Sequence, residues 1–309
     1  MNEGDSSVDE RLIDLLTEGI TLITPAQRLS RHLRFQFATY QVNQHKHAWP
    51  TPDTLPWTAW CKRTFESVAR YIDEKPILLG QLQQQWLWQD VIDKSKYKDQ
   101  LLQTSATAKQ VSNAYQLCKE WAVPIFPKDV YLSEDAFAFQ SWVRDYETRK
   151  QAKHVIDDTC LPDYLINAII ANNIVLGRFA FYGFDVLTTQ QQNLINALKQ
   201  SGNEVVELSL KTQASSVAVC AKENARSENL AAACWAREKL QQYPDATIGI
   251  VSPRLKAIRN DIAYAFQSVF EPEYLLYKNK DKQTIYSISL GQPLITFPLI
   301  HTALNLLSL

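Results

Sequence analysis

The sequence predicts an α/β protein whose parallel sheet is interrupted by a large all-helical insertion. After residue 174, short β-forming runs alternate with longer helical patterns, an order typical of a parallel sheet with helices on both faces. A first strand and helix occupy 20–42, and the stretch 58–172 has almost only helical periodicity. The 309 residues are enough for one large domain or two to three smaller ones.

The stretch GITLITPAQRLSRHL (19–33) predicts a strand at 20–24 that turns directly into a helix at 26–42. In a nucleotide-binding α/β protein this junction holds the phosphate-binding loop, but here the loop contains no glycine. One side of the helix has the spacing of a buried stripe, at Leu29, Leu33, Phe37 and Tyr40. The other side carries Arg28, Arg31 and Arg34.

The Pro-rich segment WPTPDTLPW (49–57) predicts an extended link. Helical segments follow at 58–72, 78–92, 104–123, 133–152 and 162–170. Ser133 and Pro162 are suited to helix starts. One face of the first of these segments collects Trp57, Trp60, Cys61, Phe65, Val68 and Ile72.

From 174 onward the pattern predicts strands at 174–184, 204–210, 216–221, 246–253 and 283–290. The helices between them are expected at 189–200, 227–242 and 254–270. Thr188 and Gln191 form a capping box for the first. In the second, the residues expected to face inward are Leu230, Ala233, Cys234 and Leu240. The apolar run 298–309 has no cap, so we expect the sequence to be part of a longer protein.

Composition excludes several classes of protein. Hydrophobic residues make up 46%, charged residues 21%, and the formal net charge is −1, which favours a soluble globular protein without a global attraction to nucleic acid. No apolar run reaches the length of a membrane span, and the polar N-terminus is no signal peptide. Five widely spaced cysteines indicate reduced thiols of a cytoplasmic protein, with no metal site.

The motifs of nucleotide chemistry are missing. None of the eight glycines is followed by lysine, so there is no Walker A loop and no nucleotide cofactor is predicted. The strand near 178–185 ends in Asp185, as a Walker B strand does, but Val186 stands where the catalytic glutamate belongs. An ordinary strand-end position is the alternative interpretation of Asp185.

The sequence contains one partial match to the pattern of a metal-dependent nuclease site. A PD-(D/E)xK site needs an acid, then a second acid two residues before a lysine on the next strand. Only Asp53, Asp73 and Lys75 approach this pattern, and an amphipathic helix rather than a β-hairpin separates them. The sequence therefore predicts no catalytic site, with this nuclease as the alternative.

A local basic region is present although the whole chain is nearly neutral. Residues 28–70 hold seven basic and two acidic residues, a local charge of +5. The junction could therefore hold a DNA backbone through Thr24, Arg28 and Arg31, and an ordinary solvated helix face is the alternative. Seven of the eight tryptophans lie in the first 150 residues; their helical spacing favours a helix core over a base-stacking surface.

Four segments, taken in order, resemble the N-terminal region of AddB-like bacterial proteins. They are TLITPAQRLSRHLRFQF with WPTPDTLPWTAW, FAFYGFDVLTTQQQNLINAL, ARSENLAAACWAREKLQQYPDATIGIVSPR, and ISLGQPLITFPLIHTALNLLSL. That family consists of probable DNA-repair proteins in which an inactivated superfamily I helicase precedes a PD-(D/E)xK nuclease domain. The first segment is also similar to the start of RecC, a helicase-like subunit without ATPase motifs.

The resemblance implies a P-loop-helicase-like fold. An N-terminal arm would span 1–17, domain 1A 18–57 plus 174–212, helical domain 1B 58–173, and a partial domain 2A 214–309. The DNA-contacting residues would be Thr24, Gln27, Arg28, Arg31, Arg34 and Trp57. Asp185 and Val186 would be a degenerate Walker B, and Arg254 would belong to helicase motif IV.

The expected function is a non-catalytic, helicase-like DNA-binding module of a DNA repair or recombination helicase-nuclease. Its expected partners are DNA, as a single strand or a duplex end, and a helicase-nuclease subunit. The alternative is a structural scaffold that docks a partner subunit or its own C-terminal nuclease domain without touching DNA.

Overall fold

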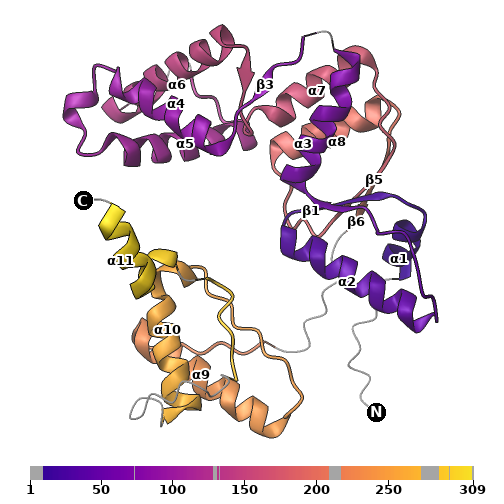
Figure 1. The fold of residues 1–309 in the computed structure, drawn as a ribbon, viewed down its shortest axis with the longest axis vertical. Helices are drawn as coiled ribbons and strands as arrows, with labels where there is room; N and C mark the ends of the chain where they lie inside the picture. Colours follow the sequence, from indigo (N-terminus) through magenta and orange to yellow (C-terminus); the bar gives the residue numbers. More distant parts are fainter. Residues whose placement is uncertain are drawn as a thin grey trace. The chain divides into compact units, whose positions relative to one another are not determined.

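A computed structural model describes residues 10–72, 74–127, 131, 133–208, 217–272, 285–291 and 293–307. The chain divides into two compact units, Met1–Thr212 and Gln213–Leu309. Each unit is described separately below (Figure 1).

The first unit is built on a parallel sheet of four strands in the order β2-β1-β5-β6. Their bounds are β1 Thr21–Thr24, β2 Thr54–Pro56, β5 Arg178–Tyr182 and β6 Glu204–Leu208. The predicted α/β class with a parallel sheet is therefore confirmed. The segment expected to be only an extended link contributes β2, which pairs with β1 in the register Leu22↔Thr54.

Helices cover both faces of this sheet. On one face lie α1 (Glu10–Thr17) and α2 (Gln27–Asn43), with Leu22 and Ala180 of the sheet in their core. On the other face lie α3 (Trp57–Val68), α7 (Leu161–Asn172) and α8 (Thr189–Gln200). Neighbouring strand residues alternate between the two cores, since Ile23, Phe179 and Phe181 face the second. The strands are thus buried from both sides.

The all-helical segment has a core of its own. That core lies among α4 (Gln81–Asp93), α5 (Thr104–Glu120) and α6 (Glu134–Ala152). At its centre the rings of Trp88 and Tyr146 stack with centroids 3.7 Å apart. The same segment contains a parallel pair of short strands, β3 (Ile77–Leu78) and β4 (Val155–Ile156). Single 3-10 turns occur at η1 (Ala69–Tyr71) and η2 (Lys98–Gln100).

Several local predictions are confirmed. Ser133 caps α6 by accepting a hydrogen bond from the Ala136 amide, and a proline lies in the first turn of α7. In α2, Leu33 and Phe37 are buried, but Tyr40 is exposed because the buried stripe passes through Ser30 and Gln41 instead.

The capping box of α8 is also present. The Thr188 hydroxyl accepts from the Gln191 amide at 3.2 Å, and the Gln191 side chain accepts from the Thr188 amide at 3.0 Å. Thr188→Ala removes the first acceptor, so we expect the free energy of unfolding to fall by about 1 kcal/mol in urea denaturation. Gln200→Ala, at the exposed end of the same helix, serves as the control; an equal loss in both variants would contradict the capping role.

The second unit contains α9 (Ala225–Gln242) packed on α10 (Leu255–Phe270), followed by η4 (Leu294–Thr296) and α11 (Pro298–Leu307). Its small core combines Ala233, Ala236, Phe266 and Val269. Leu230 and Cys234, expected to face inward, are exposed, because the contact face of α9 runs through Ala233 and Ala236 instead.

The three strands expected in this unit are not formed where the structure describes them. Residues 217–221, 246–252 and 285–290 have no strand structure, whereas 216, 283 and 284 lie outside the described residues. Val217, Val219 and Val251 are 82%, 93% and 92% exposed. A parallel strand requires hydrogen-bonded neighbours and covered faces, and these valines have no cover among the described residues.

Candidate nucleic-acid interface

The junction between β1 and α2 lies at the topological switch point of the sheet. From β1 the chain passes through α2 to β2 on one side, and from β5 it passes through α8 to β6 on the other. The two connecting helices cover opposite faces. In open α/β sheets of this kind, the crevice outside the carboxyl ends of the strands at the switch point is the usual place for a ligand.

Two loops meet at this edge, because β1 and β5 are neighbours in the register Ile23↔Phe181. One is the Pro25–Ala26 turn. The other follows β5 and holds Asp185 and Val186, both exposed. The Ala26 N-cap of α2 is extended, with φ −140° and ψ 148°, and makes no side-chain cap. Because the Ala26 side chain cannot accept a hydrogen bond, it does not cap the peptide N–H groups of the first turn of α2. These N–H groups lie at this edge, together with the positive end of the helix dipole.

Thr24 supports the turn from inside. Its side chain is fully buried, and its hydroxyl donates to the carbonyl of Ala26 at 3.1 Å and of Leu55 at 3.4 Å. The hydroxyl thereby fixes the path of the chain from β1 into α2. It does not face solvent, as a phosphate contact would require.

Arg34 joins α2 to the edge strand. Its Nε donates to the Thr54 hydroxyl at 2.7 Å, and its guanidinium also donates to the Thr54 carbonyl. Ser30 donates to the same carbonyl at 2.9 Å. The side chain of Arg34 therefore lies along β2, and its hydrogen-bonding capacity is partly used within the protein.

The solvent face of α2 carries the two other arginines of this helix. Gln27, Arg28 and Arg31 are exposed, and so are His32 and Phe35, the phenylalanine to 71%. No acidic residue occurs in α2. Sequence reasoning missed Phe35, although its spacing of four residues from Arg31 places it on the same face.

Two basic residues of 28–70 that lie outside α2 form ion pairs. Lys62 lies 2.9 Å from Asp158, and Arg63 lies 2.7 Å from Asp53. Burial by itself raises the pKa of Asp53, but hydrogen bonds from Arg63 and Thr21 and the nearby guanidinium charges hold that pKa below its ordinary value. The local charge counted from sequence therefore overstates the net field at the surface, because acidic side chains stand beside Lys62 and Arg63.

Trp57 belongs to the core. Its ring centroid is 5.4 Å from that of Trp60 and 6.3 Å from that of Phe181, beneath the sheet. Its half-buried position makes it a packing residue at the start of α3. The structure does not bring Trp57 to the same surface as Arg28 and Arg31.

The residues of the nuclease alternative have other partners. Asp53 stands at the amino end of β2 and accepts hydrogen bonds from Thr21 and Arg63. Lys75 pairs with Glu66 at 2.5 Å, and Asp73 lies outside the described residues. Within the described ranges, no group of three or more histidine, cysteine or acidic residues could hold a metal ion.

Arg254, expected in helicase motif IV, lies in the second unit at the N-cap of α10. Its side chain is exposed, and its carbonyl accepts from the amides of Ala257 and Ile258. Among the helices of the described residues, none combines the length and apolar character that a membrane span requires.

No protein-family model matches the chain, and a search of curated proteins found no significant match. The resemblance of the four sequence segments to a helicase-like region therefore stays a prediction.

Proposed function

We propose that this chain is a non-catalytic, helicase-like DNA-binding module of a DNA repair or recombination protein. The observation that carries the proposal is the acid-free, exposed face of α2, where Arg28 and Arg31 stand at the carboxyl edge of a parallel sheet. Phosphate binding at a helix N-terminus beside basic side chains is the general mode that such an edge supports.

The proposal assigns a P-loop-helicase-like arrangement to the elements. Residues 18–57 and 174–212 correspond to domain 1A, 58–173 to the helical domain 1B, and 214–309 to part of domain 2A. The loop with Asp185 and Val186 takes the place of Walker B but has no base to activate water. DNA binding is accordingly expected to be indifferent to ATP. The five free cysteines fit a cytoplasmic protein.

Of the residues expected to contact DNA, the proposal retains Gln27, Arg28 and Arg31 as direct contacts. Thr24 and Arg34 position the helix through their internal hydrogen bonds. Trp57 holds the core beneath the strands. The partners are DNA, as a single strand or a duplex end, and a helicase-nuclease subunit.

The double variant Arg28→Ala/Arg31→Ala tests the proposal. Each guanidinium–phosphate contact is expected to contribute on the order of 1 kcal/mol. The double variant should therefore bind labelled single-stranded or duplex-end DNA about 30-fold more weakly than wild type in fluorescence anisotropy.

The matched control is Lys98→Ala/Lys109→Ala, which removes the same charge from two exposed positions on the helical segment. Equal losses in the two double variants would show a diffuse charge effect and would contradict a site on α2. Addition of ATP should leave every affinity unchanged.

A scaffold that docks a partner subunit is the second candidate. It is favoured by the apolar surface of α11, where Leu299 and Leu307 are each 84% exposed. Such a surface is typical of protein contacts. Wild-type protein that binds no DNA even at low salt would favour this alternative.

A further inference from the structure

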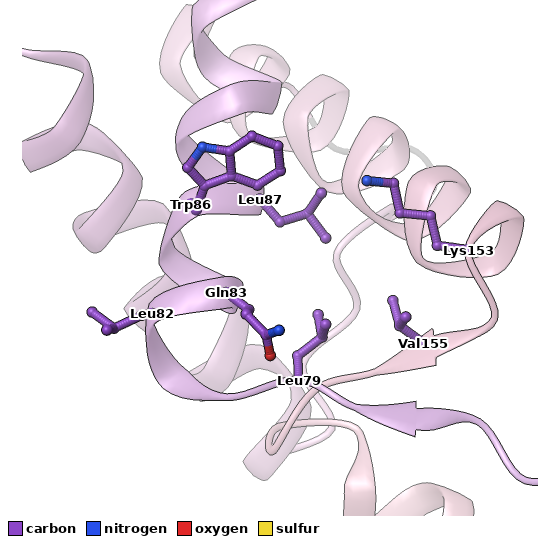
Figure 2. Close-up of a pocket in the computed structure, with 7 residues that line it drawn as sticks. All are labelled: Leu79, Leu82, Gln83, Trp86, Leu87, Lys153 and Val155. Carbon is purple, nitrogen blue, oxygen red and sulfur yellow. The ribbon is translucent and has the colours of Figure 1, made fainter.

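The helical segment contains a pocket between α4 and the β3–β4 pair, and no residue of α2 lines it. Its cavity volume is about 360 Å³, and its apolar lining comes from Leu79, Leu82, Trp86, Leu87 and Val155. Figure 2 shows Leu79, Leu87 and Val155 directed into the space between α4 and the β3–β4 pair, with the Trp86 indole at one side. A cavity of this kind accommodates one large apolar side chain.

Apolar surface continues beyond the pocket. Ile77 is paired in register with Val155 and is 66% exposed, and Leu82 is 83% exposed. Trp86, on the rim, is 60% exposed. An exposed apolar surface that extends past a cavity is characteristic of a protein-binding site rather than of a closed small-molecule site.

The charges around the pocket indicate the chemistry of its occupant. Residues 77–89 contain no charged side chain. Lys153, at the C-cap of α6, directs its Nζ to the rim, 5.7 Å from the centroid of the Trp86 ring. Within the described part of the chain, Lys153 makes no ion pair. An acidic group next to the pocket would thus meet a cation and no like charge.

We propose that this pocket docks an extended segment of a partner protein that presents a large apolar side chain next to a carboxylate. The apolar side chain fills the cavity against Leu79, Leu87 and Val155. The carboxylate pairs with Lys153 over the face of Trp86. The proposal does not depend on DNA binding, because α2 contributes nothing to the pocket.

The test uses three fluorescein-labelled hexapeptides, each with a central phenylalanine flanked by aspartates, asparagines or lysines. Wild-type protein should bind the aspartate peptide about fivefold more tightly than the asparagine peptide, since an ion pair with Lys153 at the rim contributes on the order of 1 kcal/mol. Lys153→Glu should lose this preference and favour the lysine peptide instead. Trp86→Ala should weaken all three.

Lys153 and Trp86 are exposed, so both variants should fold, as circular dichroism will check. Equal binding of the aspartate peptide by wild type and Lys153→Glu would overturn the proposal. So would binding of free phenylacetate as tight as that of the peptide, which would indicate a small-molecule site. Self-association that Leu82→Asp abolishes would identify a second copy of the chain as the occupant and would equally overturn it.

Discussion

Lys150→Met is expected to lower the free energy of unfolding by about 3–5 kcal/mol, because it leaves the buried carboxylate of Asp157 without its cation. The side chain of Lys150 is 5% exposed, and its Nζ lies 2.8 Å from Asp157 and 3.2 Å from Glu147. Tyr146 donates to Asp157 at 3.0 Å, and Tyr115 donates to Glu147. The cation thus serves two carboxylates on different segments.

The Lys150 side chain remains charged at neutral pH. Burial by itself lowers the pKa of Lys150, but the negative charges of Asp157 and Glu147 and the hydrogen bond to Asp157 outweigh it, so the pKa lies above its ordinary value. Burial raises the pKa of the Cys160 thiol to about 12. A raised lysine pKa stabilises the fold below the unfolded-state pKa, and this stabilisation is lost only as the pH rises through the folded-state pKa. The effect of Lys150→Met should therefore be the same at pH 6 and pH 8.

Urea denaturation of Lys150→Met and of the exposed control Lys98→Met measures this effect. Replacing both members of the buried pair, in Lys150→Met/Asp157→Leu, should recover part of the loss because the buried carboxylate is removed together with its cation. A loss below about 1 kcal/mol for Lys150→Met would show that water reaches the cluster and that the pair does not stabilise the fold.

Asn203→Ala is expected to cost about 3 kcal/mol of unfolding free energy. The Asn203 side chain accepts from the amides of Leu176 at 2.6 Å and Gly177 at 3.1 Å. It donates to the carbonyls of Ile174 and Leu198, each at 3.1 Å. These four hydrogen bonds join the turn before β5 to the turn before β6, and a typical one contributes about 0.5–1.5 kcal/mol net.

Asn196→Ala, on the exposed side of α8, is the matched control and should be nearly neutral. Asn203→Asp should fall between wild type and Asn203→Ala, since it keeps the two acceptor interactions and loses the two donors. If Asn203→Ala unfolds at the same urea concentration as wild type, the turns are held by other contacts.

The parts of the fold that local chemistry determines could be predicted from the sequence. The capping box at Thr188 and the N-cap at Ser133 depend on residues three positions apart, and both are present. The alternation of strands and helices likewise led to the parallel sheet of the first unit. These features need no knowledge of distant contacts.

Long-range partners were the parts that the sequence could not supply. Asn203 lies 27 residues from Leu176, and Arg34 lies 20 residues from Thr54, so no periodicity connects them. The apolar runs of the second unit have strand-like composition, but composition cannot reveal whether a neighbouring strand is available. Strand propensity alone was therefore misleading at 246–253.

The features of the candidate site also divide into those that helix periodicity predicts and those that depend on tertiary contacts. The exposure of Arg28 and Arg31 follows from the period of α2, which places them opposite Leu33 and Phe37. The burial of Thr24, the attachment of Arg34 to β2 and the packing of Trp57 in the core depend on tertiary contacts. Counting basic residues along the chain could not reveal that Lys62 and Arg63 form ion pairs or that Arg34 is bonded to β2.

The salt dependence of DNA affinity tests the central claim most directly. Anisotropy titrations of wild type and Arg28→Ala/Arg31→Ala would be made over a series of salt concentrations. If both arginines contact phosphates, the slope of log K against log salt should be smaller in magnitude by about two in the double variant. Identical slopes, or no binding by wild type at the lowest salt, would contradict a DNA-binding face on α2.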